Sequence, residues 1–179
     1  MTTVALLQVD VSQAPMQEYE PIIELIHAQA GVSDVVCLPE LWSVGAFNTS
    51  AMEPSAIDLS SRLIIDLGRA ATSAKVWLHA GSFIQREGHQ LFNTSVLFRP
   101  DGSIAQIYRK IHLFGFDQGE ARMLTAGHHI AAITDTPLGT LGLSTCYDLR
   151  FPELFRRQVS QGVETFVVTA SWPTERLAH

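Results

Sequence analysis

The sequence of 179 residues predicts an α/β domain built in layers. Short apolar runs rich in β-branched residues alternate along the chain with longer segments of helical periodicity. Most of the expected strands are apolar throughout, which is typical of sheets whose outer faces are covered by helices. With 46% hydrophobic and 17% charged residues, the composition suits one globular domain with a sizeable core.

The first part of the chain alternates strand and helix. Strands are expected at 2–9 and at 34–38, where a proline ends the second run. Between them, residues 16–30 have apolar side chains at helical spacing, and Gly31 follows where a glycine often ends a helix.

A second helix is expected at 59–73, with Asp58 as its N-cap. Strands dominate the middle of the chain, and they are expected at 76–84, 91–98, 104–108, 130–134 and 138–145. The turns between them contain Glu87-Gly88, Pro100-Asp101-Gly102 and Thr136-Pro137. The last elements expected are a helix at 151–160, between Pro152 and Gly162, and a strand at 165–169.

The charge and cysteine content exclude several classes of protein. A net charge of −6 without basic clusters argues against nucleic acid or anionic lipid as the main partner. The N-terminus has no basic segment, and Gln8 and Asp10 interrupt its apolar run, so it resembles a buried strand more than a signal peptide. Two cysteines make a disulfide framework improbable. We therefore expect a cytoplasmic protein that does not bind membranes.

Cys146 is the first candidate for chemistry. It ends the apolar run 141–145 and precedes the helix expected at 151–160. Such a strand–turn–helix setting exposes a nucleophile beside backbone N–H groups. Most free cysteines are instead small buried hydrophobic residues, and Cys37 is interpreted in that way.

Glu40 and Lys110 also follow strands. Glu40 precedes the apolar pair Leu41-Trp42, and partial burial there raises a carboxyl pKa toward the range of a general base. Lys110 follows the strand expected at 104–108, and in a cleft it would stabilise developing negative charge. Each residue alone is more often solvated, but ligands collect at strand ends, where Cys146 also lies.

Three motifs around these residues resemble those of the nitrilase superfamily of carbon–nitrogen hydrolases. C-L-P-E-L-W at 37–42 resembles the glutamate motif, and Y-R-K-I-H-L-F at 108–114 resembles the lysine motif. G-L-S-T-C-Y-D-L-R-F-P-E-L at 142–154 resembles the cysteine motif. The order and wide spacing of the motifs also agree, and three extended motifs are far more specific than any one of them.

The resemblance implies a four-layer α-β-β-α sandwich, formed by residues 1–179 as a single domain, and homo-oligomers in which sandwiches dock on one another. It also implies a catalytic role for Glu120, whose segment 119–127 matches a second conserved glutamate that orients the lysine or the first glutamate. Members of the superfamily continue beyond Ser171-Trp172-Pro173 with a helix and further strands. The resemblance therefore implies that the C-terminal part of the sandwich is missing here, which bears on folding and activity.

The resemblance also implies a mechanism that needs no cofactor and no metal. Glu40 takes the thiol proton of Cys146, which attacks an amide or nitrile carbon, and Lys110 and the backbone N–H of Tyr147 hold the oxyanion. The cysteine motif looks closest to the small-amide hydrolases, which include ω-amidase-like enzymes and those acting on deaminated glutathione. We therefore expect hydrolysis of a small amide to a carboxylate and ammonia through a thioester.

Three more residues are candidates for substrate binding. Phe114 and Trp172 could line the pocket, although aromatic residues after strands more often belong to the core. Arg150 could bind a substrate carboxylate, although an ion pair with Asp148 or Glu153 is a somewhat commoner use of such an arginine.

Other functions stay open at this point. The same triad serves nitrilases and N-carbamoyl amide hydrolases, and a truncated sandwich could act as a non-enzymatic scaffold. A metallo-hydrolase is disfavoured, because the seven histidines form no H-x-x-x-H motif and no C-x-x-C occurs. His128 and His129, as neighbours on a strand, would also face opposite sides.

Overall fold

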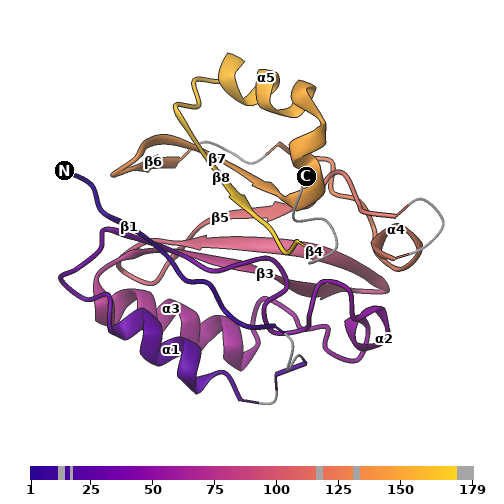
Figure 1. Ribbon diagram of the computed structural model, residues 1–179, viewed down its shortest axis with the longest axis horizontal. Coiled ribbons are helices and arrows are strands. Elements are labelled where there is room, and N and C mark those ends of the chain that lie inside the picture. The colour runs from indigo at the N-terminus through magenta and orange to yellow at the C-terminus, as the bar shows by residue number, and fades with distance from the viewer. Residues whose placement is uncertain (12–14, 17, 116–118, 131–133, 173–179) are drawn as a thin grey trace.

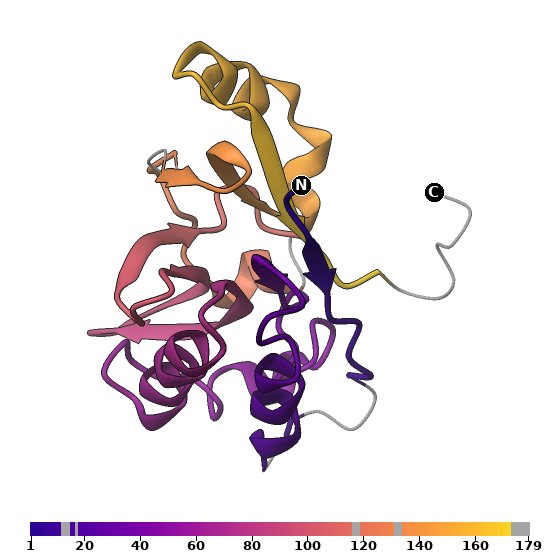
Figure 2. The ribbon, with the colours of Figure 1, turned by 90° about the vertical axis from the view of Figure 1, so that its left-hand side faces the viewer.

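The computed structural model describes residues 1–11, 15–16, 18–115, 119–130 and 134–172. Two β-sheets lie face to face between outer layers of helix, with α1 and α3 on one side and α5 on the other (Figures 1 and 2). The strands are β1 (Val4–Leu6), β2 (Val35–Cys37), β3 (Trp77–Glu87), β4 (Gln90–Phe98), β5 (Ile104–Arg109), β6 (Thr134–Thr136), β7 (Gly139–Thr145) and β8 (Thr165–Thr169). The helices are α1 (Glu20–His27), α2 (Thr49–Met52), α3 (Arg62–Ala74), α4 (Glu120–Met123), α5 (Pro152–Ser160) and the 3₁₀ helix η1 (Cys146–Arg150). This arrangement confirms the predicted α-β-β-α sandwich.

The larger sheet has the order β1-β2-β3-β4-β5, and the smaller sheet has the order β6-β7-β8. In the larger sheet β1, β2 and β3 are parallel, whereas β3, β4 and β5 are antiparallel neighbours. In the smaller sheet β7 pairs antiparallel with β6 and parallel with β8. The strands β2, β5 and β7 are each followed by one of the residues singled out in the sequence.

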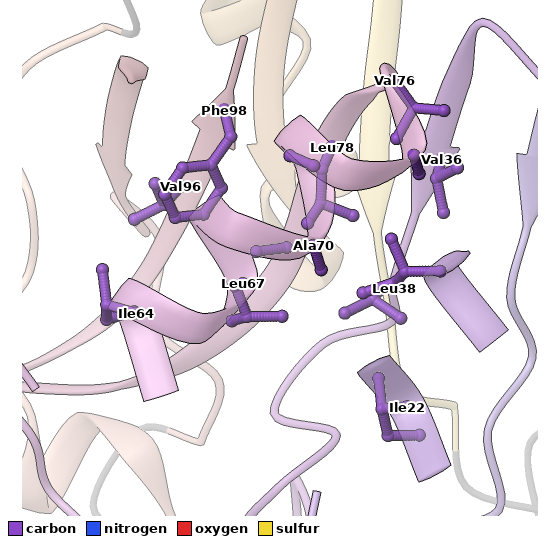
Figure 3. Packing of buried hydrophobic residues seen from close by; sticks show 14 of the residues in the cluster. Ile22, Val36, Leu38, Ile64, Leu67, Ala70, Val76, Leu78, Val96 and Phe98 are labelled. Atoms are coloured by element: carbon purple, nitrogen blue, oxygen red, sulfur yellow. The ribbon is translucent and has the colours of Figure 1, made fainter. Parts of the chain in front are cut away.

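Two apolar layers hold the sandwich together. In the outer layer, α3 presents Ile64, Leu67 and Ala70 to the larger sheet, where they meet side chains of β2, β3 and β4 (Figure 3). The inner layer lies between the sheets and contains Leu97, Tyr108, Leu141 and Leu143. Both faces of β3 and β4 are therefore buried, in agreement with the helix-covered sheets expected from the sequence.

Helix α1 is shorter than the segment 16–30 expected from periodicity. It begins at Glu20 because Pro21 fits only the first turn of a helix, where its missing N–H costs no hydrogen bond. It ends at His27, and turns continue to Gly31, which has a φ of +70°.

Helix α3 starts three residues later than expected, and its N-cap is Ser61 instead of Asp58. The carboxylate of Asp58 accepts hydrogen bonds from the backbone N–H of Ser60 at 2.8 Å and from its hydroxyl at 2.6 Å. This local turn competes with helix formation, which explains the delay.

The remaining differences concern strand ends. Strand β1 is three residues long instead of extending over 2–9. The strand expected at 130–134 is wrong at Ile130, which lies outside any strand, while residues 131–133 are outside the described part of the chain. The following hairpin does turn near Thr136-Pro137, because Thr136 pairs with Gly139.

Among the described helices, none is both long and apolar enough to cross a membrane.

An irregularity in β3 fixes the segment that carries Glu40. Between His79 and Ser82 the pairing of β3 with β4 shifts, and Gly81 has a φ of +64°. The backbone N–H of Ser82 donates to the carbonyl of Pro39 at 3.2 Å, and the hydroxyl of Ser82 accepts from the N–H of Leu41 at 3.0 Å. These bonds bracket Glu40 on both sides.

Gly81→Ala is expected to lower the free energy of unfolding by at least about 2 kcal/mol, because it combines overpacking with a left-handed backbone. A Cβ at this position would overlap the carbonyl oxygen of Pro39. Gly88→Ala is the matched control, since its φ is +58° but nothing lies within 4 Å of the added atom. We expect it to cost about 1 kcal/mol. Equal urea midpoints for the two variants would contradict the packing argument.

Candidate functional site

A cavity of about 300 Å³ lies where the segments after β2, β5 and β7 meet. In Figure 1, β5 and β7 run toward the side of the molecule on which α4 lies. The cavity is lined by Glu40, Ala46, Phe47, Thr49, Lys110, Phe114, Gly115, Gly119, Glu120, Cys146, Tyr147, Arg150, Ser171 and Trp172. All eight residues selected from the sequence are in this set.

Lys110 lies between two carboxylates in the buried part of the cavity lining. Its Nζ donates to Oε1 of Glu40 at 2.8 Å and to Oε2 of Glu120 at 2.6 Å. All three side chains are at least 95% buried. The alternative that Glu40 and Lys110 are solvated residues at the surface is therefore wrong. Burial alone would lower the pKa of Lys110, but the two carboxylates raise it, so the ammonium stays charged.

Burial raises the pKa of Glu40. The charge of Lys110 and the hydrogen bonds that Glu40 accepts from Lys110 and the Ser171 backbone lower it. The two oxygens of Glu40 face different groups. Oε1 accepts from Lys110, and Oε2 accepts from the backbone N–H of Ser171 at 3.0 Å. The same Ser171 offers its carbonyl to Sγ of Cys146 at 3.8 Å. Glu40 and Cys146 are thus held against one short backbone segment.

Asn93 is a member of the site that the sequence analysis missed. Its Nδ2 donates to Oε1 of Glu40 at 3.1 Å and to Oε1 of Glu120 at 2.6 Å. Asn93 lies in β4, which is otherwise buried on both faces. An amide inside a strand of that kind is a signal that could have identified it, because buried polar groups need partners.

Cys146 occupies a strained position directly after β7. Its φ is +46°, in the left-handed region that a residue other than glycine rarely adopts. The turn is held by a capping box, in which the backbone N–H of Thr145 donates to Oδ2 of Asp148 at 2.9 Å. Strain of this kind, held by surrounding bonds, is common at functional sites.

Asp148 is a second member that the sequence analysis missed in this role. It is fully buried, and its Oδ2 also accepts from the hydroxyl of Tyr108 at 2.6 Å. Its Oδ1 accepts from the backbone N–H of His112 at 2.9 Å and lies 2.8 Å from Nδ1 of the same residue. The carboxylate therefore ties the segment around Lys110 to the turn that presents Cys146.

The thiol of Cys146 is not an intrinsically acidic one. Burial raises its pKa, the negative charge of Glu40 raises it further, and Lys110 opposes the shift only in part. A free thiolate is consequently disfavoured. Cys37 is buried with its pKa raised to about 11 by desolvation, in line with its interpretation as a core residue.

An aromatic wall forms one side of the cavity. The ring of Phe114 makes edge-to-face contacts with Tyr147, at a centroid distance of 5.4 Å, and with Phe47 at 6.3 Å. Trp172 is 36% exposed and also faces the cavity. Phe114 and Trp172 are therefore pocket residues, and the expectation that they belong to the core is wrong. The backbone N–H of Phe114 donates to Glu120 at 2.9 Å, which connects this wall to the buried charges.

Arg150 does not form the ion pairs that the sequence favoured. Asp148 is occupied by Tyr108, Thr145 and His112, and Glu153 pairs with Arg156 at 3.4 Å. The guanidinium instead lies 5.8 Å from the ring centroid of Trp172 and lines the cavity. The expected pairing with Asp148 or Glu153 is therefore wrong.

Within the described ranges, no group of three or more histidine, cysteine or acidic side chains could hold a metal ion. His128 and His129 lie outside any strand, and their ring centroids are 4.2 Å apart. The prediction that they would face opposite sides of a strand is wrong, because the chain bends at His129 instead of forming a strand.

Comparisons with known proteins relate nearly the whole chain to one family. The model of the carbon–nitrogen hydrolase family matches residues 3–179. A 2-oxoglutaramate amidase of Paenarthrobacter nicotinovorans is 42% identical over 156 residues, which are 83% of this chain and 53% of that protein. A 2-oxoglutaramate amidase of Bacillus subtilis is 30% identical over 178 residues, which are 99% of this chain and 68% of that protein.

Among solved structures, Saccharomyces cerevisiae Nit3, a member of branch 10 of the nitrilase superfamily, superposes with a TM-score of 0.80 at 26% identity. The match covers 98% of this chain and 66% of Nit3. The chain thus spans about half to two thirds of the length of these similar proteins. With a family model that matches nearly every residue, the protein belongs to the carbon–nitrogen hydrolase family, within the nitrilase superfamily.

Proposed function

We propose that this protein is a cysteine-dependent amidase that converts a small amide into a carboxylate and ammonia. The observation that carries the proposal is the meeting of Cys146, Glu40 and Lys110 in one cavity. A nucleophile, a carboxylate and a buried cation are the three groups that acyl transfer requires. The amidase names of similar proteins support this reaction over nitrile hydrolysis.

In the first step Glu40 removes the proton of the Cys146 thiol while the sulfur attacks the amide carbon. Transfer during attack is needed because the thiol pKa is raised and a standing thiolate is disfavoured. The carbonyl oxygen becomes an oxyanion that Lys110 and the backbone N–H of Tyr147 stabilise, at about 3–4 kcal/mol per donor. Glu120 orients Lys110.

In the second step Glu40 returns the proton to the amide nitrogen and the C–N bond breaks. Ammonia departs, and the acyl group remains bound to Cys146 as a thioester. Glu40 then takes a proton from water, the hydroxide attacks the thioester, and the proton returns to the sulfur. The products are a carboxylic acid and ammonia, and the enzyme is regenerated.

The substrate is proposed to be an ω-amide, with an amide at one end and a carboxylate at the other. A cavity of about 300 Å³ suits a short molecule. Arg150 supplies a planar guanidinium that could bind the distal carboxylate through two hydrogen bonds. Phe114 and Tyr147 would flank the carbon chain that joins this carboxylate to the amide. The names 2-oxoglutaramate amidase and ω-amidase of similar proteins support a substrate with this layout.

The cytoplasmic location and the homo-oligomeric state expected from the sequence stay predictions. A reducing compartment fits the mechanism, because Cys146 has to be a free thiol.

Cys146→Ala is expected to abolish ammonia release from short ω-amides while leaving the thermal unfolding midpoint close to that of the parent protein. Cys37→Ala is the matched control and should retain activity, because Cys37 lies in the core away from the cavity. Ammonia is measured enzymatically after incubation with ω-amides, nitriles and N-carbamoyl acids. Hydrolysis retained by Cys146→Ala would overturn the mechanism. Preferential turnover of a nitrile or an N-carbamoyl acid would overturn the substrate class.

Arg150→Met is expected to raise KM for amides with a distal carboxylate by about 10-fold to 100-fold, since hydrogen bonds to charged groups are lost. KM for an uncharged amide of similar length should change little. Arg157→Met, an exposed arginine of α5, serves as the control and should leave both values unchanged. A similar loss for charged and uncharged amides would show that Arg150 supports the pocket without selecting carboxylates.

A further inference from the structure

Asn93 makes side-chain contacts that serve the two buried carboxylates. It is 1% exposed, and both hydrogens of its Nδ2 are used, one for Glu40 and one for Glu120. Its carbonyl oxygen Oδ1 accepts no hydrogen bond from the described residues. The NH₂ group of this side chain is therefore directed at the two carboxylates of the site.

The orientation of the amide follows from its partners. An ionised carboxylate only accepts hydrogen bonds, so the group that lies 2.6 Å from Glu120 has to be the NH₂. A flipped amide would place its carbonyl oxygen against two carboxylates, which is repulsive.

The site has an excess of negative charge that Lys110 alone does not balance. The charged and titratable groups facing Glu40 are Lys110 after β5, Glu120 in α4 and Cys146 in η1. Two carboxylates share one ammonium, and after burial the negative charge of Glu120 is a further cause that raises the pKa of Glu40. Asn93 adds one N–H donor to each carboxylate without adding a charge. Because Asn93 supplies these donors, the positive charge of Lys110 remains available to stabilise an oxyanion.

We propose that Asn93 is a positioning residue for the amidase reaction proposed above, keeping Glu40 ionised and fixing which of its oxygens serves as the base. Oε1 of Glu40 is engaged by Asn93 and Lys110 together. Oε2 has the Ser171 N–H as its neighbour, on the side where Sγ of Cys146 contacts the Ser171 carbonyl. Oε2 is consequently the atom that receives the thiol proton.

The sign of the pH effect follows from the bonds. Hydrogen bonds donated to a carboxylate favour its charged form, so their loss raises the pKa of Glu40 further. A base with a higher pKa loses its function at a higher pH. Asn93→Leu, which keeps the number and branching of the side-chain heavy atoms and removes the donors, should therefore shift the acid side of the pH profile upward.

The test measures the alkylation rate of Cys146 by iodoacetamide as a function of pH, with the modified peptide quantified by mass spectrometry. This measurement does not require turnover of a substrate. The buried Cys37 in the same sample is an internal reference for the alkylation of a cysteine outside the site. For Asn93→Leu we expect the pH of half-maximal rate to rise by about one unit. On an ω-amide, kcat should fall about tenfold or more with KM nearly unchanged, because Asn93 does not line the cavity.

Gln158→Leu is the matched control, because Gln158 is a fully buried amide of α5 that donates to the carbonyl of Leu143 at 2.9 Å, outside the cavity. It should lose stability without shifting the alkylation profile. If Asn93→Leu does not fold, Asn93→Ser, whose shorter hydroxyl donates one hydrogen bond at most, should give a smaller upward shift. A profile for a folded Asn93 variant that coincides with those of the parent and of Gln158→Leu would overturn the proposal. Alkylation that shifts as expected in a protein releasing no ammonia would refute the amidase and leave the positioning role supported.

Discussion

The buried ion cluster of Lys110 with Glu40 and Glu120 is the interaction on which the rest of the site depends. Removing three charged groups from water is costly, and mutual attraction offsets that cost only with good geometry and additional hydrogen bonds. Those bonds come from Asn93 and from the backbone of Phe114 and Ser171. The cluster is thus weak evidence for stability and strong evidence for a chemical role.

The fold holds this cluster in place through backbone features beside each reactive group. Glu40 is followed by Leu41, with a φ of +45°, and is bracketed by bonds to the irregular segment of β3. Cys146 itself has a positive φ, and the backbone N–H of the preceding Thr145 donates to the carboxylate of Asp148. Rigid strands end at these points, so small changes in sheet packing would move the nucleophile and the base relative to one another.

The cavity lining combines groups of different chemistry, and this combination underlies the proposed substrate. The charges of Glu40, Lys110 and Glu120 are buried, whereas Arg150 lies beside the partly exposed Trp172. The aromatic wall of Phe47, Phe114 and Tyr147 also contributes to the cavity. A molecule with an amide, a short carbon chain and a carboxylate would complement all three parts.

The sequence by itself determined the layered α/β class, most of the strands and the motifs that contain Cys146, Glu40, Lys110 and Glu120, because periodicity and local motifs are encoded in neighbouring residues. Only the tertiary structure decided that Arg150 lines the cavity instead of pairing with Asp148 or Glu153. It decided between pocket and core for Phe114 and Trp172, which line the cavity. It also decided that Asn93 and Asp148 belong to the site. Their roles depend on partners more than 25 residues away in the chain, such as Glu40 for Asn93 and Tyr108 for Asp148. No local pattern specifies such contacts, since they arise only when separate strand ends are packed together.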